Sequence, residues 1–479
     1  MSTPPDTRPA DSVRADAAEP FSRLALPAAT LANLTQLGYV AMTPIQAASL
    51  PLALAGEDLI AQAKTGSGKT AAFALPLLSK LDARRFAVQA LVLCPTRELA
   101  DQVALEVRRL ARAEENIKVL TLCGGSPIGP QFASLEHGAH VVIGTPGRVM
   151  DHLRRGTLKL AALTTLVLDE ADRMLDMGFL EDIVTVVKQC PVERQTLMFS
   201  ATYPEEIKIL SRQFMRSPKE VMLTEQHTAE KIRQRFYAVD EDERLQAVSR
   251  LLLHFRPVRT LAFCNTKQRC RDLVEHLRAD GIVALALHGD LDQRERDQVL
   301  VQFVNKSCSV LVATDVAARG LDIEALEAVV NVDLTRDAEV HTHRIGRTGR
   351  VDEEGWALTL VGPRDQYSLT RIEELQGAPV DWHTLTELVP KSREPLVPPM
   401  VTLQILGGRK EKIRKGDVLG ALTGEAGFDA SQIGKITVND SATYVAVDRA
   451  IGDKALRKLS TGRVKGREVR VRMLRANED

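Results

Sequence analysis

Short apolar runs alternate along the first part of the chain with segments whose apolar residues recur at helical spacing. The runs that predict strands cover residues 58–61, 88–95, 141–146, 165–170 and 195–202. Residues 97–111 predict one of the intervening helices, because Leu99, Val103 and Leu110 fall on one face. Apolar strands that alternate with helices predict a doubly wound parallel sheet, in which ligands bind at the carboxyl-terminal ends of the strands.

The same alternation begins again after a charged stretch at 225–235. The strand candidates of this second series cover residues 259–266, 283–289, 309–315, 328–333 and 356–362. A chain of 479 residues is too long for one ordinary core. We therefore expect two α/β lobes, at 21–217 and 231–376, joined by an interlobe linker at 218–230.

Residues 401–479 follow a different pattern. Strands are predicted at 401–406, 433–438, 443–448 and 468–474, and helices at 415–423 and 449–459. The order βαββαβ on a short chain is typical of a small α+β RNA-recognition fold. Proline recurs through 377–400, which predicts a semi-rigid linker before this module.

Charge and cysteine content limit the classes of function. The 63 basic and 63 acidic residues give a formal net charge of zero, so nucleic acid would have to be held by local patches. The C-terminal module, with 16 basic and 10 acidic residues, is one such patch at net +6. Six scattered cysteines without a CxxC pair argue against a zinc site or a disulfide framework. No apolar run is long enough to span a membrane, and residues 1–20 predict a disordered tail, so we expect a cytoplasmic protein.

Residues 63–70, AKTGSGKT, lie between a predicted strand and a predicted helix. Gly66, Ser67 and Gly68 would let backbone N–H groups turn toward a phosphate at the helix N-terminus. Lys69 could then reach the terminal phosphates, and Thr70 could hold Mg²⁺. The pattern departs from GxxxxGK[ST] only at Ala63. The alternative is a flexible Gly/Ser turn without a ligand.

A second nucleotide-binding candidate, Thr43-Pro44-Ile45-Gln46, stands shortly before this loop. Thr43 could cap a helix opened by Pro44. Alternatively, the amide of Gln46 reads the edge of adenine while Phe21 or Tyr39 stacks on the base. The sequence leaves both interpretations open.

An acidic pair ends the buried run 165–170. Asp169 is then positioned to bind the Mg²⁺ of a nucleotide, and Glu170 to act on the attacking water. The alternative is that these carboxylates only cap the following helix.

The second lobe has no phosphate loop of its own. It contributes the segments 314–322 and 343–350, whose repeated arginines are poor core material and good phosphate ligands. Two half-sites that face one nucleotide would make a clamp that ATP closes. A solvated basic loop on a surface helix is the alternative.

The C-terminal module has a degenerate version of the aromatic strand on which RNA-recognition folds stack bases. Tyr444 is the one aromatic residue left on it, so we expect RNA binding to depend on Tyr444 together with basic side chains. These basic side chains are Arg409, Lys410, Lys412, Arg414 and Lys415.

Taken together, residues 21–376 resemble the DEAD-box RNA helicases, with every expected motif in the expected order. The resemblance implies two tandem RecA-like lobes, with the adenine motif at 43–46, the phosphate loop at 63–70 and the acidic motif at 169–172. It implies ATP and Mg²⁺ as cofactors, Arg347 and Arg350 as arginine fingers, and Asp315 near the ribose. Coupling of hydrolysis to unwinding is implied for Ser200 and Thr202, together with Asp172 and His343. The RNA-backbone contacts that it implies are Thr96, Arg97, Gly125, Thr145 and Arg148 in the first lobe, and Gly289, Gln293, Arg296 and Thr314 in the second.

The C-terminal module looks like the RNA-binding domain of the bacterial DbpA subfamily, on the residues at 407–410, 413–417 and 419–424. This likeness implies an RNA-dependent ATPase, recruited to hairpin 92 of 23S ribosomal RNA in large-subunit precursors. We expect a monomer without DNA or membrane partners. The alternatives are an ATP-gated RNA clamp with little turnover and a DNA translocase.

Overall fold

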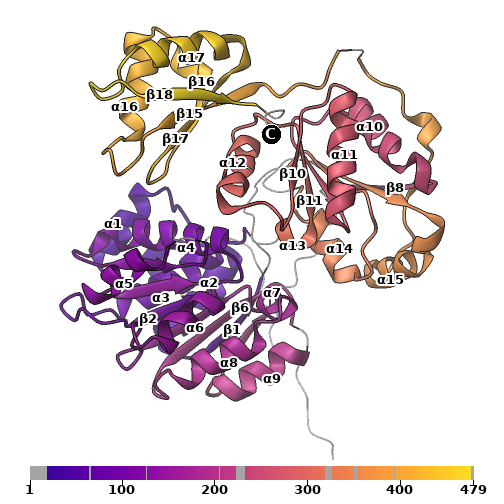
Figure 1. Ribbon diagram of the computed structural model, residues 1–479. Coiled ribbons are helices and arrows are strands. Elements are labelled where there is room, and N and C mark those ends of the chain that lie inside the picture. The colour runs from indigo at the N-terminus through magenta and orange to yellow at the C-terminus, as the bar shows by residue number, and fades with distance from the viewer. Residues whose placement is uncertain are drawn as a thin grey trace, which may run out of the picture. The chain divides into compact units, whose positions relative to one another are not determined.

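The computed structural model describes residues 19–63, 66–125, 127–203, 205–222, 232–318, 326–349, 354–392 and 394–475. They group into two compact units, of which one is lobe 1 and the other contains lobe 2 with the C-terminal module (Figure 1). Most of the predicted tail and interlobe linker lies outside the described residues. Among those residues, the helices are all too short or too polar to cross a bilayer.

Lobe 1 is built on a seven-stranded parallel sheet in the order β3-β4-β2-β5-β6-β1-β7. The strands are β1 (Leu59–Gln62), β2 (Ala90–Leu93), β3 (Val119–Leu122), β4 (Val141–Gly144), β5 (Thr165–Asp169), β6 (Gln195–Ser200) and β7 (Lys219–Met222). The helices are α1 (Ala28–Gln36), α2 (Pro44–Leu54), α3 (Lys69–Ser79), α4 (Arg97–Leu110), α5 (Gly129–Glu136), α6 (Pro146–Arg154), α7 (Ala171–Asp176), α8 (Leu180–Lys188) and α9 (Glu205–Phe214).

Helices cover both faces of this sheet. Successive residues of a strand point to opposite faces, so each strand contributes side chains to two hydrophobic cores. Val92 and Val167 pack on one face with residues of α2, α3 and α4. Leu91 and Leu168 pack on the other with residues of α6, α8 and α9. The unbroken apolar runs of the sequence thus reflect strands covered by helices on both sides.

Lobe 2 repeats the architecture with a seven-stranded parallel sheet in the order β10-β11-β9-β12-β13-β8-β14. The strands are β8 (Ile232–Ala238), β9 (Thr260–Cys264), β10 (Ala284–Leu287), β11 (Val310–Thr314), β12 (Ala328–Asn331), β13 (Gly355–Val361) and β14 (Trp382–His383). The helices are α10 (Arg244–Phe255), α11 (Lys267–Ala279), α12 (Gln293–Val304), α13 (Asp315–Ala318), α14 (Ala338–Ile345) and α15 (Gln366–Gln376).

The C-terminal module has a four-stranded antiparallel sheet in the order β16-β17-β15-β18. The strands are β15 (Met400–Leu406), β16 (Ile433–Val438), β17 (Thr443–Asp448) and β18 (Arg470–Leu474). The helices are α16 (Lys415–Gly420), which continues into a π-helical turn over Ala421–Glu425, and α17 (Gly452–Thr461). The predicted fold class, two parallel α/β lobes followed by a small α+β module, is confirmed.

The structure differs from the predicted boundaries at three places. β3 and β8 were not predicted, since their residues are only partly buried and include polar side chains. Residues of the predicted interlobe linker form β7, which pairs with β1. The Pro-rich stretch at 377–400 packs along lobe 2, where Leu388 and Leu396 join the hydrophobic core. The apolar residues spaced among the prolines could have indicated this packing. The proline content instead predicted a linker.

Candidate active site

Gln46 joins the phosphate loop to the start of α2. Its Nε2 donates to Gly68 O at 3.0 Å, and its Oε1 accepts from Thr43 N at 3.0 Å. Gly68 has a φ of 91°, and a Cβ there would lie 2.5 Å from Gln46 Nε2. Glycine is therefore required at Gly68 both by the backbone conformation and by the packing. The side chain of Gln46 thus caps Thr43 N at the start of α2, whereas the Thr43 hydroxyl, which was predicted to cap this helix, has no hydrogen-bond partner among the described residues. Reading of adenine by Gln46 stays a prediction.

The side chains of Lys69 and Asp169 each have a buried polar atom without a hydrogen-bond partner in the part of the chain that the structure describes. Lys69 begins α3 and is 6% exposed, and its Nζ has no hydrogen-bond partner among the described residues. Asp169 ends β5 and is 3% exposed, and its Oδ1 also lacks one in that part of the chain. Burial raises the pKa of Asp169 to about 7, although Lys69 acts in the opposite direction. Such atoms are rare in folded proteins and mark places where an ion, ligand or water supplies the missing contacts.

Glu170 has a fixed orientation. Its φ of 52° lies in the left-handed region, where residues with side chains are uncommon and often belong to active sites. Arg173 Nη1 donates to Glu170 Oε2 at 2.8 Å, and both side chains are buried. Arg173 was missed by sequence reasoning, although its position three residues after Glu170 on a helix predicts such a pair.

The acidic motif is bonded directly to the segment that follows β6. Asp172 Oδ2 accepts from Ala201 N at 3.1 Å, Thr202 N at 2.9 Å and Thr202 Oγ1 at 3.0 Å. Ser200 Oγ accepts from Asp172 N at 3.3 Å. Three of the residues predicted to couple hydrolysis to unwinding are therefore in contact.

Asp172→Asn tests this connection. The amide must point its NH₂ group either at the Ala201 and Thr202 donors or at the N–H of Arg173, which Asp172 Oδ1 accepts at 3.0 Å in the native protein. We expect a loss of stability of about 1–3 kcal/mol, because buried donors would face each other. We also expect unwinding to fall more than ATP hydrolysis. The ratio of strand separation to ATP consumed measures this, and an equal fall in both rates would rule out a coupling role.

Phe21 and Tyr39 lie together beside the adenine motif. Their ring centroids are 5.9 Å apart in an edge-to-face arrangement, and Phe21 is buried. Tyr39 OH donates to Glu106 Oε1 at 2.6 Å, and burial together with Glu106 raises the pKa of Tyr39 well above its usual value. The hydroxyl of Tyr39 is thus engaged by α4, and stacking of either ring on a base stays a prediction.

The predicted RNA contacts of lobe 1 lie near the carboxyl-terminal edge of its sheet. Thr96 caps α4, where its side chain accepts from Leu99 N at 3.3 Å, and Thr145 is the N-cap residue of α6. Arg97 lies across Gly125, whose φ is 73° and where any Cβ would overlap the guanidinium. The positive φ favours glycine at Gly125, and a side chain there would displace the guanidinium of Arg97 from its present position.

Arg148 is held by a residue that the sequence analysis missed. Arg148 Nη1 donates to Gln131 Oε1 at 2.9 Å, and His152 Nε2 lies 2.9 Å from the same oxygen. Gln131 Nε2 in turn donates to Cys123 O at 3.1 Å. Burial and the charge of Arg148 lower the pKa of His152. Gln131 of α5 thereby joins β3 to α6.

In lobe 2, Asp315 is paired with an arginine rather than left open. Its two carboxylate oxygens accept from Arg344 Nε at 2.7 Å and Nη2 at 2.6 Å. Arg344 is 2% exposed, also donates to Asn265 Oδ1 at 3.1 Å, and lies over the ring of Phe263. The expectation that arginines of 343–350 are poor core material is wrong for Arg344, because a carboxylate, an amide and a ring surround it.

The remaining lobe 2 candidates lie at the ends of strands and helices. Thr314 ends β11, Gln293 begins α12, and Arg296 Nη2 donates to Ala317 O at 2.8 Å. Gly289 follows β10, His343 lies in the last turn of α14, and Arg347 is buried just after this helix. Arg350 lies outside the described residues.

The basic candidates of the C-terminal module are all exposed. They occupy the loop between β15 and α16 and the first residue of α16, namely Arg409, Lys410, Lys412, Arg414 and Lys415. Arg409 Nε lies 3.2 Å from Asp440 Oδ1, and the exposed setting makes this ion pair a weak one. The loop therefore presents its positive charge to solvent.

Tyr444 is not available for stacking, which corrects the sequence-based expectation. It is 4% exposed and packs with Ala442, Leu474 and Val301 of α12, while Gln404 Nε2 donates to its hydroxyl at 3.2 Å. Thr402, on the neighbouring strand, accepts from Asn305 Nδ2 at 3.1 Å. The sheet surface around Tyr444 is covered by lobe 2, and the strand pattern alone could not reveal this.

Tyr444→Ala should therefore affect stability rather than affinity. Truncation of a buried aromatic side chain leaves a cavity, and we expect a loss of about 3 kcal/mol. Affinity for RNA at a temperature where the variant is folded should be unchanged. Thermal unfolding and RNA titration measure the two effects. A variant of normal stability with weakened RNA binding would restore the stacking role.

Comparisons with known proteins agree with this arrangement. A DEAD/DEAH box helicase family model matches residues 43–210, a helicase conserved C-terminal domain matches 243–352, and a DbpA RNA binding domain matches 402–473. The ATP-dependent RNA helicase DbpA of Escherichia coli (strain K12) is 51% identical over 456 residues, which cover 95% of this chain and 99% of that protein. The chain belongs to the DEAD-box ATP-dependent RNA helicases, in the DbpA family. This helicase is an RNA-dependent ATPase.

Other relatives share less of the helicase. The ATP-dependent RNA helicase CshA of Listeria monocytogenes serovar 1/2a is 47% identical over 355 residues, which cover 74% of this chain and 68% of that protein. The solved structure of S. cerevisiae Dbp5 bound to RNA and ADP BeF3 has a TM-score of 0.70 and 29% identity, covering 77% of this chain and 97% of that one. Among these three proteins, DbpA is the one whose similarity extends over almost the whole chain.

Proposed function

We propose that this helicase separates short RNA duplexes in 23S ribosomal RNA, recruited at hairpin 92 during cytoplasmic assembly of the large ribosomal subunit. The observation that carries the proposal is the match to DbpA over 95% of the chain, which includes the RNA-binding module. The exposed basic loop after β15 supports it, since positive side chains bind phosphates. We further propose that the helicase acts as a monomer. Its proposed domain boundaries are the predicted ones, revised as described above.

The proposed ATP site combines the phosphate loop with residues that precede it. Gly66, Ser67 and Gly68 would bind phosphates through the N-terminus of α3, and Lys69 would neutralise their charge. The adenine would contact Gln46 and Thr43 and lie beside Phe21 and Tyr39, while Asp315 of lobe 2 would lie near the ribose. The unpartnered ammonium of Lys69 supports a phosphate ligand at this position.

The residues present also fit Mg²⁺. Thr70 follows Lys69 at the start of α3, and the Asp169 oxygen that lacks a partner supplies the hard ligand this cation prefers. We propose Thr70 and Asp169 as the residues that hold it. When bound, Mg²⁺ neutralises charge on the phosphates during their transfer.

Hydrolysis and RNA binding divide between two sets of residues. Glu170 would take the proton of the attacking water, and Arg347 and Arg350 would stabilise the charge that develops on the transferred phosphate once the lobes close. Ser200, Thr202, Asp172 and His343 would link this event to RNA. The RNA contacts proposed for the lobes reach backbone groups rather than bases, so the lobes would be blind to sequence.

The role of the module is tested by ATPase stimulation in the full-length helicase. We expect a hairpin 92 fragment to reach half-maximal stimulation at far lower concentration than a hairpin of the same length with scrambled sequence. Equal concentrations would contradict the proposed target. A helicase that binds the fragment without stimulation would be the clamp, and equal stimulation by matched DNA would favour a translocase.

Alanine at Lys410, Lys412 and Lys415 should weaken binding of the hairpin fragment. Removal of each lysine that binds a phosphate should reduce the magnitude of the slope of log affinity against log salt concentration by about 0.7–0.9. The matched control replaces Lys454, Arg457 and Lys458 of α17, three basic residues that are equally exposed. Salt titrations of both triple variants provide the measurement. The same slope in both would show that the loop makes no specific contribution.

A further inference from the structure

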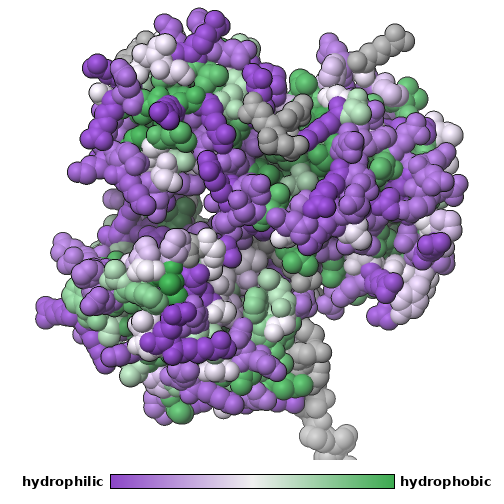
Figure 2. Space-filling view, viewed as in Figure 1, coloured by the Kyte–Doolittle hydropathy of each residue, from purple (hydrophilic) through white to green (hydrophobic). Residues whose placement is uncertain are grey.

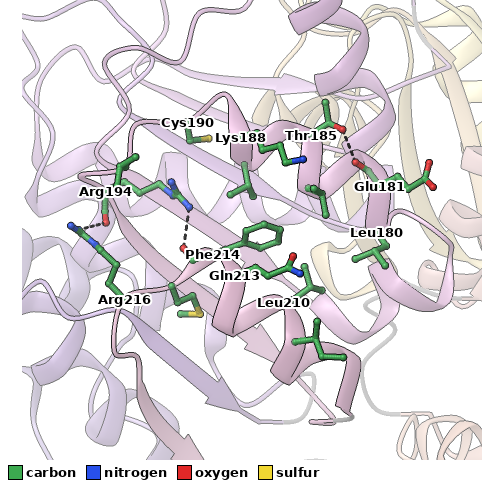
Figure 3. Close-up of a pocket in the computed structure, with 15 residues that line it drawn as sticks. Leu180, Glu181, Thr185, Lys188, Cys190, Arg194, Leu210, Gln213, Phe214 and Arg216 are labelled. Atoms are coloured by element: carbon green, nitrogen blue, oxygen red, sulfur yellow. Dashed lines mark hydrogen bonds between the residues drawn. The ribbon is translucent and has the colours of Figure 1, made fainter.

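An apolar groove runs between α8 and α9 of lobe 1, with a volume of about 1010 Å³. Val184 of α8 and Leu210 and Phe214 of α9 line it. Figure 3 shows Leu180, Thr185 and Lys188 of α8 on one side and Leu210, Gln213 and Phe214 of α9 on the other. None of the nucleotide or RNA candidates lines it. The groove is therefore separate from the residues proposed to bind ATP and RNA.

The groove reaches the edge of the sheet opposite the active site. Arg194 lines it and directly precedes β6, whereas Ser200 of the coupling motif ends the same strand. A strand of this length separates the two edges by roughly 17 Å. A molecule bound near Arg194 would thus leave the ATP and RNA residues accessible.

Large apolar side chains are exposed around the groove. Leu180 is 44% exposed, Ile209 49% and Val192 76%. The face of the molecule in Figure 2 is mostly hydrophilic, with hydrophobic residues in small scattered patches. Apolar side chains that gather on the rim of a groove are characteristic of binding surfaces.

The charges of the groove are distributed unevenly along it. Glu181 lies in the first turn of α8, whereas Lys188 ends this helix, about 10 Å further on. Arg194 is buried, and its Nη1 and Nη2 donate to Pro191 O at 2.8 Å and to Phe214 O at 3.0 Å. Neither Lys188 nor Arg194 forms an ion pair in the described part of the chain. Arg216 also lines this end of the groove, and Glu193 pairs with it at 2.8 Å. The exposed Lys188 is therefore the positive charge at this end that a partner could reach.

We propose that this groove docks an amphipathic helix of a partner protein. Its apolar stripe, at spacing i, i+3, i+4 and i+7, would cover Ile209, Leu210 and Phe214, and a carboxylate would meet Lys188. Two neighbouring helices form a channel of the shape that a third helix fills. The tail of this chain is a poor occupant, since Met1 and Val13 are the only large apolar residues in 1–18.

The test uses the full-length helicase with the photo-crosslinker benzoylphenylalanine at Val192, on the rim. A control places it at Leu105 of α4, which is 61% exposed and lies outside the groove. After irradiation in the native host, the crosslinked peptides are sequenced. We expect Val192, and not Leu105, to capture segments with an apolar stripe and an acidic end.

The captured segment is then synthesised and titrated. Ile209→Arg and Lys188→Glu should each weaken its binding about tenfold or more. A peptide with lysine in place of its acidic residue should bind Lys188→Glu better than the original peptide does. RNA-stimulated ATPase should stay unchanged in both variants, which shows that they fold.

Four results would overturn the proposal. Identical crosslinks from Val192 and Leu105 would show a nonspecific surface, and crosslinks to RNA would show a nucleic-acid surface. Crosslinks to a second copy of this chain would make the groove a self-association face. Titrations in which neither variant changes the affinity would place the contact elsewhere.

Discussion

Glu170→Gln is expected to keep ATP and RNA bound while slowing hydrolysis by about 10²–10⁴-fold. The amide preserves the shape of the side chain but cannot take the proton of the attacking water. Strand separation that depends on ATP binding alone should still occur once. The helicase should then not be released for a second round. Single-turnover hydrolysis and RNA release measure the two steps separately.

The buried pair of Glu170 and Arg173 requires a control. Glu170→Gln leaves a buried guanidinium without its carboxylate, which we expect to cost about 3 kcal/mol of folding stability. Arg173→Gln breaks the same pair but retains the carboxylate. The two variants should lose similar stability, whereas only Glu170→Gln should lose nearly all hydrolysis. Normal turnover in Glu170→Gln would show that another group is the base.

Lys69→Ala is expected to lower ATP turnover by at least about 10³-fold and to weaken ATP binding. Lys69 is buried at the start of α3 with an unpartnered ammonium, so it is preorganised for the charge of a triphosphate. Without it, the charge of bound phosphates would face the carboxylate of Asp169. Titration with a fluorescent ATP analogue and steady-state ATPase assays measure both losses.

Lys69→Arg is the matched control for charge. It keeps a positive group but replaces a flexible point charge by a planar fork, so we expect ATP binding to recover in part while turnover stays low. Unfolding curves of both variants show whether lobe 1 remains folded. Wild-type turnover in Lys69→Ala would refute the proposed phosphate site.

The sequence predicted the strands whose pattern of apolar residues is clear within a short window. β16 and β17 have the predicted bounds, and the strands β4, β5 and β6 begin at the predicted residues. β8 was missed because Arg233 and Arg235 interrupt its apolar pattern. Arg235 lies over the ring of Trp356 at 4.9 Å, a contact with a residue far along the chain. Such long-range partners are invisible to a local window.

In the candidate site too, some residues are predictable from a local pattern and others depend on contacts far along the chain. The sequence predicts the motif residues from their type and spacing, because phosphate and metal chemistry demands them, and their roles stay predictions. Arg173, Gln131 and Arg344 were not identified, since their role is to hold those residues in position through contacts that depend on the fold. Tyr444 was wrongly assigned to RNA for the opposite reason: an aromatic residue on a strand indicates a stacking surface until tertiary packing covers it.

The most direct test of the account is strand separation on a duplex that adjoins hairpin 92. The substrate is a short RNA duplex joined to the hairpin fragment, and the control carries a scrambled hairpin of equal length. The account predicts that ATP-dependent separation occurs at far lower helicase concentration with hairpin 92 than with the scrambled hairpin. It also predicts that neither substrate is separated repeatedly when ATP cannot be hydrolysed. Equal separation of both substrates, or repeated separation without hydrolysis, would contradict it.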